Sequence, residues 1–338
     1  MTQASRRSGW RFWIDRGGTF TDLVARSPGG ELVVRKVLSA ATGGDPLVTA
    51  IRELLGVAPG APLPEGAIAE VRLGTTVATN ALLERSGAPT LLLVSRGFAD
   101  ALLIGDQHRP DLFALRIEKP EQLYGRVLEV GGRLAADGSE LEPLGLDAEL
   151  EAELRRARAD GYHSLAVALL HGARHPRHER ALGEWLRRLG FETVALSHQV
   201  SPLTKLVPRA QTAVLEAYVD PPLRSYLGQL QAALGPGCGL RVMQSSGGLI
   251  APEQLRAKDT ILSGPAGGLV GACRIASAVQ LEANGSGAQG LAAIVGFDMG
   301  GTSTDVFHSA GPERPWERCS ETEIAGLTLQ APMLAIHT

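Results

Sequence analysis

The sequence has few cysteines, no long apolar run and no secretion signal, and each absence excludes a class of protein. Its three cysteines, Cys238, Cys273 and Cys319, stand far apart in the chain, so they match neither a disulfide framework nor a zinc-binding pattern. We therefore expect reduced thiols and a cytoplasmic location. No apolar run reaches the ~18 residues that a transmembrane helix needs, and the N-terminal residues lack the apolar core of a signal peptide.

The sequence also gives no sign of a nucleic-acid partner or of the common nucleotide-binding loops. Its formal net charge of −3 gives no reason to expect binding to nucleic acid or to an anionic membrane. The pattern G-x-x-x-x-G-K-[ST] is absent, which excludes a P-loop NTPase. One G-x-G-x-x-G match begins at Gly285, but it precedes a predicted strand instead of following one, so we do not interpret it as a dinucleotide site.

What the sequence does contain is an internal repeat. Residues 15–22 read Asp-Arg-Gly-Gly-Thr-Phe-Thr-Asp and residues 298–305 read Asp-Met-Gly-Gly-Thr-Ser-Thr-Asp, so both fit D-x-G-G-T-x-T-D. A short apolar run precedes each copy. An ordinary glycine-rich hairpin explains one copy well but explains a matched pair poorly. The repeat therefore predicts two related phosphate-handling turns, one on each lobe of a two-lobed nucleotide site.

The residue types of the repeat suit phosphate and Mg²⁺. Paired glycines let the backbone turn tightly and present N–H groups to an anion, and threonine hydroxyls add further donors. Asp15 and Asp298 suit a hydrated Mg²⁺, and we predict that both have catalytic and metal-binding roles. The predicted contacts to the nucleotide come from Gly17, Gly18, Thr19, Thr21, Gly300, Gly301, Thr302 and Thr304.

Strand and helix patterns alternate along the chain, which predicts an α/β fold with a parallel or mixed sheet covered by helices. The first motif is predicted at the tip of a hairpin formed by residues 12–14 and 19–26, followed by a strand at 31–36. Further strands are predicted at 71–73, 90–95, 164–170, 191–196 and 241–243. Helices are predicted from Asp45 to about 55, at 74–85, 98–104, 146–160 and 176–189, and from Pro208 with an interruption at Pro221-Pro222.

Two further segments open predicted helices and can add contacts to a ligand. Gly74, Thr75 and Thr76 follow a strand, and the free N–H groups of a helix N-terminus can bind phosphate or substrate. A simple threonine cap is the alternative. Residues 263–268 predict a tight turn into a helix through Cys273, with glycines that mainly permit close packing. In the polar loop 105–111, Arg109 can hold a substrate carboxylate with two hydrogen bonds.

These residues carry a close resemblance to the hydantoinase/oxoprolinase family. The matching segments cover essentially the whole chain and lie at residues 14–22, 74–85, 109–113, 245–249, 262–268 and 296–306. The repeated unit also resembles the paired phosphate turns of the actin/Hsp70/sugar-kinase ATPases. The resemblance implies a two-lobed α/β ATPase fold, with residues 1–207 as the N-terminal lobe and residues 208–338 as the start of an incomplete second lobe.

The resemblance also implies a reaction, the ATP- and Mg²⁺-dependent opening of the 5-oxo-L-proline lactam to L-glutamate through phosphorylation of its carbonyl oxygen. Gly74, Thr75, Thr76 and Arg109 are the predicted substrate contacts. Three alternatives stay open. They are hydrolysis of hydantoin or N-methylhydantoin, a subunit of the acetone-carboxylase type, and a non-catalytic nucleotide-binding module.

The chain departs from the family pattern in two places. His108 stands where members more often carry a small residue, which leaves the choice between a lactam and a cyclic imide open. The chain stops at Thr338 without an adenosine-binding turn after the second motif. We therefore expect a fragment that is inactive alone, that needs the C-terminal region or a hydantoinase B-type chain, and that forms a homo-oligomer when complete.

Overall fold

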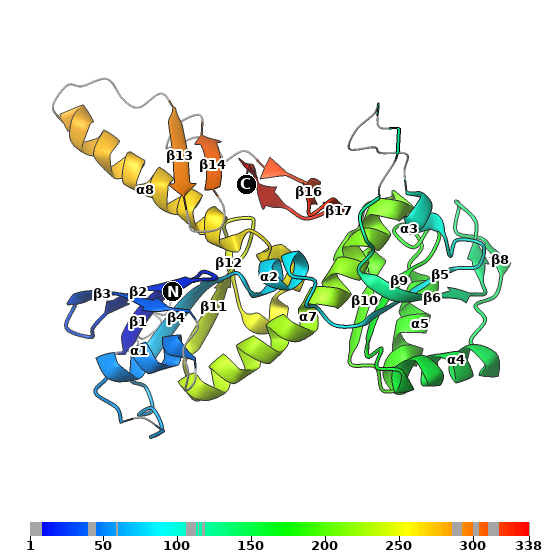
Figure 1. The fold of residues 1–338 in the computed structure, drawn as a ribbon, viewed down its shortest axis with the longest axis horizontal. Coiled ribbons are helices and arrows are strands. Elements are labelled where there is room, and N and C mark those ends of the chain that lie inside the picture. Colours follow the sequence, from blue (N-terminus) through cyan, green and yellow to red (C-terminus); the bar gives the residue numbers. More distant parts are fainter. Residues whose placement is uncertain are drawn as a thin grey trace, which may run out of the picture.

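The structure is a computed structural model that describes residues 9–39, 45–58, 60–105, 113, 115–116, 119–285, 293–299, 304–309 and 318–337. The long helix α7 (Leu206–Leu234) runs between two α/β bodies, one built on the strands near the N-terminus and the other on residues 90–196 (Figure 1). A third group, formed by a second long helix and the last strands, stands beside the first body (Figure 1).

The first body is a six-stranded sheet in which the predicted hairpin is confirmed. Its strand order is β12-β11-β4-β1-β2-β3. The strands are β1 (Trp10–Arg16), β2 (Phe20–Arg26), β3 (Leu32–Leu38), β4 (Ile68–Thr75), β11 (Gly239–Met243) and β12 (Leu249–Ile250). Strand β1 is antiparallel to β2 and parallel to β4, which sets Asp15 opposite both Asp22 and Gly74. Two helices flank this sheet, α1 (Pro46–Leu54) and α2 (Val77–Leu83).

The start of α1 follows the predicted cap. Asp45 precedes the helix in extended conformation, and its side chain accepts a hydrogen bond from the Leu47 N–H at 2.9 Å. Pro46 occupies the first helical position, where its missing N–H costs nothing. Leu47, Ala50 and Ile51 then turn one face into the core, so local signals alone specify this helix.

The second body is a four-stranded parallel sheet in the order β10-β9-β5-β6. Strands β5 and β9 are buried along their whole length, as their continuous apolar sequences predict. The strands are β5 (Thr90–Ser95), β6 (Tyr124–Val130), β9 (Ser164–Ala168) and β10 (Thr193–Leu196), with a small ribbon of β7 (Arg133–Leu134) and β8 (Glu140–Glu142). The helices are α3 (Ala101–Ile104), α4 (Ala148–Ala159), α5 (Arg177–Arg188) and α6 (Ser197–Val200).

A buried ion pair joins α7 to this second body. Arg209 on α7 and Glu179 on α5 are both fully buried, and their side chains meet at 3.0 Å. Glu179 also accepts hydrogen bonds from the Leu169 and His198 N–H groups, at 2.9 and 3.0 Å. Because removing one partner of a buried pair leaves the other charge without compensation, this contact fixes the place of α7 on β9 and β10.

The third group contains the second copy of the repeat, and its predicted hairpin is also confirmed. Strands β13 and β14 pair so that Asp298 lies opposite Asp305, the register that Asp15 and Asp22 have in the first copy. Phe307 covers Gly296, where any side chain would collide with the ring. The elements of this group are α8 (Ser263–Gly285), β13 (Ile294–Met299), β14 (Thr304–Ser309), β15 (Arg318–Cys319), β16 (Thr322–Ile324), β17 (Leu327–Leu329), β18 (Met333–Leu334) and β19 (Ile336–His337). Two short helices before α8, η1 (Pro252–Gln254) and η2 (Ala257–Thr260), pack against β11 and α7.

Two helix predictions are wrong. Helix α7 continues through Pro221 and Pro222. A proline costs a helix one backbone hydrogen bond, and the buried side chains on both sides of the pair compensate for that loss. The turn expected at residues 263–268 is instead the start of α8, whose Ala266, Leu269 and Cys273 pack against Phe307 in one apolar cluster. Their spacing of three and four residues is helical, and it outweighs the low helix propensity of the glycines.

The predicted lobe boundary near Val207-Pro208 falls in the first turn of α7. The chain then returns to the first sheet, because β11 lies parallel to β4. The division into 1–207 and 208–338 stays a prediction. Among the described residues, we find no helix that combines the length and the apolar character needed to cross a bilayer.

Candidate functional site

The two motif hairpins border one pocket of about 680 Å³. Gly18 and Thr19 come from the tip of the first hairpin, and Asp305 comes from the second. The starts of α2 and α8, which lie far apart in sequence, form the wall between them. The lining is completed by Thr76, Thr79, Asn80, Leu83, Glu84, Leu262, Ser263, Gly264, Pro265, Thr322, Glu323, Ile324, Ala325 and Ile336.

Asp15 has the most perturbed environment in the first motif. Asp15 is exposed to solvent, but nearby parts of the chain partly desolvate its carboxylate, and this desolvation raises its pKa above the ordinary 3.8. The negative charges of Asp22 and Asp298 raise the pKa further, while Lys36 opposes them. The two repeats therefore bring their first aspartates within electrostatic range of each other.

Two glycines keep space free around the Asp15 carboxylate. A Cβ atom at Gly74 would stand 3.0 Å from Asp15 Oδ1, and one at Gly264 would stand 3.4 Å from the same atom. Gly74 is the strand neighbour of Asp15, and Gly264 lies in the first turn of α8. The carboxylate is thus approached from the sheet and from a helix N-terminus, whose partial positive charge favours anions.

Within the first motif, the structure separates residues that line the pocket from residues that hold the hairpin. The Gly17 N–H donates to the Phe20 carbonyl at 3.0 Å, so this predicted phosphate donor is used inside the turn. Thr21 is buried, and its hydroxyl lies 3.0 Å from the Ser39 hydroxyl, which donates to the Gly17 carbonyl at 2.7 Å. The Thr21 side chain therefore lies on the interior face of β2 and not among the residues that line the pocket, and its predicted nucleotide contact stays a prediction.

The second motif is only partly described. Asp298 is exposed, and Thr304 begins β14 with a partly exposed side chain. Asp305 is only 9% exposed and lines the pocket. The predicted contacts at Gly300, Gly301 and Thr302 lie outside the described residues, as does the predicted carboxylate contact at Arg109.

The two threonines before α2 have different roles. Gly74 and Thr75 end β4 and do not open the helix as predicted. Thr75 is buried, and its hydroxyl accepts from the N–H of Val77, the first residue of α2, at 3.3 Å. Its carbonyl accepts from the Ser263 hydroxyl at 3.1 Å, which ties α8 to α2. Thr76 lines the pocket, and its hydroxyl donates to the Arg16 carbonyl at 3.2 Å. Thr76 occupies the N-cap position of α2 without a side-chain capping bond, and the predicted ligand contacts of Thr75 and Thr76 stay predictions.

Sequence reasoning missed two parts of the pocket. Asn80 lies one turn after Thr76 on α2 and donates to its hydroxyl at 3.4 Å, and this i, i+4 spacing was readable in the sequence. The β16–β17 hairpin, which contributes Thr322 and Ile324, carries no such signal because its place depends on tertiary packing. No group of three or more metal-binding side chains occurs among the described residues.

The comparisons identify the family. The N-terminal region model of the hydantoinase/oxoprolinase family matches residues 11–190, and the family's hydantoinase A model matches residues 209–338. The chain therefore belongs to the hydantoinase/oxoprolinase family. It is 37% identical over 376 residues to 5-oxoprolinase from Dictyostelium discoideum, covering 100% of this chain and 30% of that protein. It is 32% identical over 345 residues to the caprolactamase subunit alpha from Pseudomonas jessenii, covering 97% of this chain and 47% of that subunit.

Two solved structures share the fold. Nucleotide-free acetone carboxylase superposes with a TM-score of 0.76 at 25% identity, and the ATP-dependent caprolactamase from Pseudomonas jessenii with 0.74 at 29% identity. Each match covers 97% of this chain and 47% of the other chain. The predicted α/β fold of this family's ATPases is thus confirmed. This chain spans less than a third of the length of the 5-oxoprolinases that it matches.

Proposed function

We propose that this chain provides the nucleotide-binding part of an enzyme that couples ATP hydrolysis to the opening of 5-oxo-L-proline to L-glutamate. The observation that carries the proposal is the convergence of the two D-x-G-G-T-x-T-D hairpins on one pocket, with the charge of Asp298 acting on Asp15. The 37% identity to a 5-oxoprolinase over the whole chain supports the choice of substrate.

The residues around Asp15 fit a hydrated Mg²⁺. Mg²⁺ is bound through one or two carboxylates and keeps several waters, so Asp15 and Asp298 are a sufficient protein contribution. The space kept by Gly74 and Gly264 beside the Asp15 carboxylate suits such a hydrated ion. When bound, Mg²⁺ neutralises charge on the phosphates of ATP. The repulsion by Asp22 and Asp298, which adds to desolvation in raising the pKa of Asp15, would then be relieved by the cation.

The residues that line the pocket, which do not include Asp15 and Asp298, fit the phosphate groups. The backbone of Gly18 and the hydroxyl of Thr19 stand at the tip of the first hairpin, and the α8 N-terminus adds further N–H groups. In the second motif we assign the matching roles to Gly300, Gly301, Thr302 and Thr304. Gly17 and Thr21 support the first hairpin.

The chemistry that this arrangement serves is activation of an amide. A lactam carbonyl is a poor electrophile, because the nitrogen lone pair is delocalised into it. Transfer of the γ-phosphoryl group to the carbonyl oxygen, with ADP as the leaving group, removes that stabilisation. Water then adds to the carbonyl carbon, and the C–N bond breaks to release the amine and open the ring. Hydrolysis of the resulting acyl phosphate gives the carboxylate and inorganic phosphate. Phosphoryl transfer depends mainly on positioning and charge stabilisation. We assign positioning of the lactam to Thr76 and Gly74, with Arg109 on its carboxylate.

A second candidate substrate is a cyclic amide without a carboxylate. The similarity to caprolactamase covers 97% of this chain, and Leu83, Ile324 and Ile336 give the pocket an apolar wall. In this case Arg109 has no carboxylate to bind. We propose for either substrate that the rest of the active site comes from a further region or from a hydantoinase B-type chain, in a cytoplasmic homo-oligomer.

The proposal is tested on the protein purified from its natural source with every chain that remains bound to it. ADP and product formation are measured with 5-oxoproline, hydantoin, caprolactam and no added amide. We expect ADP formation to depend on 5-oxoproline and to yield L-glutamate. Dependence on caprolactam alone would establish the second candidate, and ADP formation that no amide stimulates would establish a nucleotide-binding module.

A further inference from the structure

A second pocket, of about 300 Å³, lies between α7, β10 and the segment that contains η1 and η2. It shares no described lining residue with the pocket at the two motifs, so the two sites can be tested separately. We propose that this second pocket binds a free α-amino acid, with the ammonium group at Glu216 and Asp220 and the carboxylate group at Arg256.

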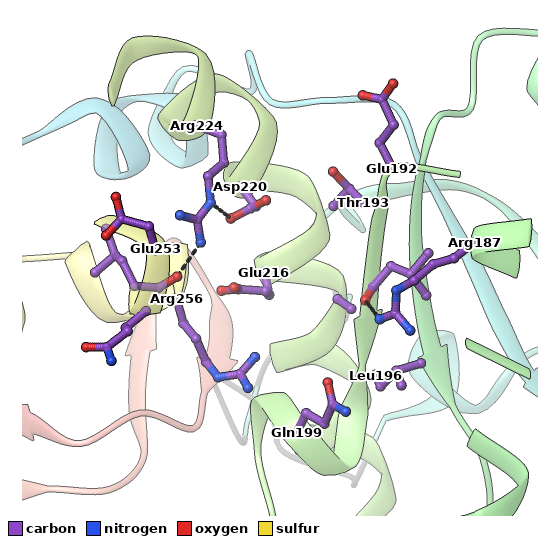
Figure 2. A pocket seen from close by; sticks show the side chains of 14 residues that line it. Arg187, Glu192, Thr193, Leu196, Gln199, Glu216, Asp220, Arg224, Glu253 and Arg256 are labelled. Carbon is purple, nitrogen blue, oxygen red and sulfur yellow. Dashed lines mark hydrogen bonds and ion pairs between the residues drawn. The ribbon is translucent and has the colours of Figure 1, made fainter. Parts of the chain in front are cut away.

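The acidic side of the pocket is built on α7. Glu216 is only 7% exposed, and Asp220 follows it one helical turn later. In Figure 2, Glu216 lies between Asp220 above it and the Arg256 guanidinium below it. A carboxylate this buried is retained only where hydrogen bonds or an opposite charge compensate it.

Part of that compensation comes from the protein. Glu216 accepts hydrogen bonds from the Ala257 N–H at 3.2 Å and the Lys258 N–H at 2.8 Å. A carboxylate has about four acceptor positions, so two such bonds leave capacity for the N–H groups of a ligand. Lys258 is buried, but its ammonium group pairs with Asp259. The position facing the pocket therefore suits an ammonium group from outside the chain.

A neighbouring ion pair fixes the shape of the acidic side. Arg224 donates to Asp220 at 3.0 Å and also to the carbonyls of Pro252 and Leu255. Its guanidinium thus anchors the η1 segment to α7 and does not serve as an open anion site. The hydrogen bond from Arg224 also holds the Asp220 carboxylate in one orientation, one helical turn after Glu216.

The basic side of the pocket is formed by other arginines. Arg256 is half-buried, and no hydrogen bond or ion pair joins its guanidinium to the residues that the structure describes. Arg187 stands on the opposite wall beside β10 (Figure 2). A guanidinium fork matches a carboxylate, so Arg256 suits the α-carboxylate and Arg187 can reach a second acidic group on a longer side chain.

The combination of charges selects the class of ligand. A simple anion would be repelled by Glu216 and Asp220, and a simple cation would be repelled by Arg256. A zwitterion satisfies both sides, and the pocket volume is at the small end of ligand sites. Burial raises the pKa of Glu216 to about 7, and an ammonium group beside it would lower this pKa again. Binding near neutral pH should therefore release a proton.

The test is calorimetric titration of the whole chain with L-glutamate and with glycine at pH 7, in two buffers that differ in ionisation enthalpy. We expect saturable binding in the millimolar range or tighter, with a heat that changes between the buffers because a proton is released. N-acetylglycine, which lacks the ammonium group, and glycine methyl ester, which lacks the carboxylate, should not bind.

Variants locate the binding at this pocket. Glu216→Gln keeps an acceptor for the backbone N–H groups, and Arg256→Ala changes a half-buried side chain. Each should weaken binding at least about tenfold through loss of a charge-assisted hydrogen bond. Glu184→Gln, on the exposed face of α5, makes the same charge change outside the pocket and should leave binding unchanged. Absence of saturable binding by either amino acid, or equal binding by the acetylated compound, would overturn the proposal.

Discussion

The negative charge of Asp298, near the C-terminal end of the chain, acts on Asp15, near its N-terminal end, and adds to the desolvation and the charge of Asp22 that raise the pKa of Asp15. The interaction requires that the two repeated hairpins face each other, and both hairpins border the same pocket. Each hairpin sets its first aspartate opposite a second one, Asp22 or Asp305. The two copies of the sequence motif therefore form the same antiparallel hairpin with the same strand register.

Replacing either first aspartate in the complete enzyme, with every chain that remains bound to it, should strongly lower ATP turnover without unfolding the protein. Asp15→Asn and Asp298→Asn each remove a carboxylate proposed for Mg²⁺, and we expect turnover to fall by about 10²–10³-fold or more. Circular dichroism should show an unchanged fold. Asp100→Asn, at an exposed residue whose side chain makes no capping bond to α3, is the matched control. Near-normal turnover in both motif variants would contradict the shared site.

Asp15 is expected to support ATP turnover, but its ionised carboxylate should lower the stability of the folded protein at neutral pH. A carboxyl group whose pKa is higher in the folded state than its ordinary 3.8 favours folding at low pH, and this contribution is lost as pH rises through the folded-state value. Asp15→Asn should therefore raise the melting temperature of the metal-free protein at pH 7, and the two curves should converge below pH 4. A lower melting temperature for the variant at pH 7 would show that the carboxylate is compensated in the folded protein.

The glycine beside Asp15 should be intolerant of a side chain. Gly74→Ala places a methyl group 3.0 Å from Asp15 Oδ1, so the carboxylate must shift, and Mg²⁺-dependent nucleotide binding should weaken about tenfold or more. The control is Gly271→Ala in α8, which meets no atom within 4 Å. The Gly271→Ala control should stabilise the helix by about 0.5–1 kcal/mol and leave nucleotide binding unchanged. Titration of both variants with nucleotide and Mg²⁺ measures the effect on binding.

Glu216 should make the stability of the protein depend on pH in the neutral range. Its pKa is raised from 4.5 to about 7, chiefly by burial, with Asp220 and Asp259 adding to the shift and Lys258 opposing it. The contribution of Glu216 to the free energy of unfolding is fully present below about pH 4.5 and is lost as the pH rises through about 7. The loss is on the order of 3 kcal/mol. In Glu216→Gln, the denaturation midpoint should change little between pH 5 and 8. If the midpoint of the variant depends on pH as strongly as that of the unaltered protein, another group causes the pH dependence.

Local signals made much of this structure predictable. The Asp45 cap, the apolar strands β5 and β9 and both motif hairpins follow from neighbouring residues, and all of them are found. The continuous helix through Pro221 and Pro222 was not predictable, because its stability comes from packing of distant strands on α7. The start of α8 at Ser263 escaped for the same reason, since its burial depends on Phe307.

The candidate site shows the same division. The motif residues Gly18 and Thr19 are found at the pocket as expected, but Thr21 faces the interior, because alternate residues of a strand point to opposite faces. The β16–β17 hairpin reaches the pocket only through the tertiary fold. A motif thus identifies the loop that carries the chemistry, while the strand register decides which of its side chains face the ligand.

A structure of the protein with Mg²⁺ and a non-hydrolysable ATP analogue shows whether the two motifs form one site. We expect a single metal ion held by Asp15 and Asp298, directly or through one shell of water, with the phosphates between the tips of the two hairpins. A nucleotide that contacts one hairpin only, or a metal ion bound away from both aspartates, would contradict a single shared site.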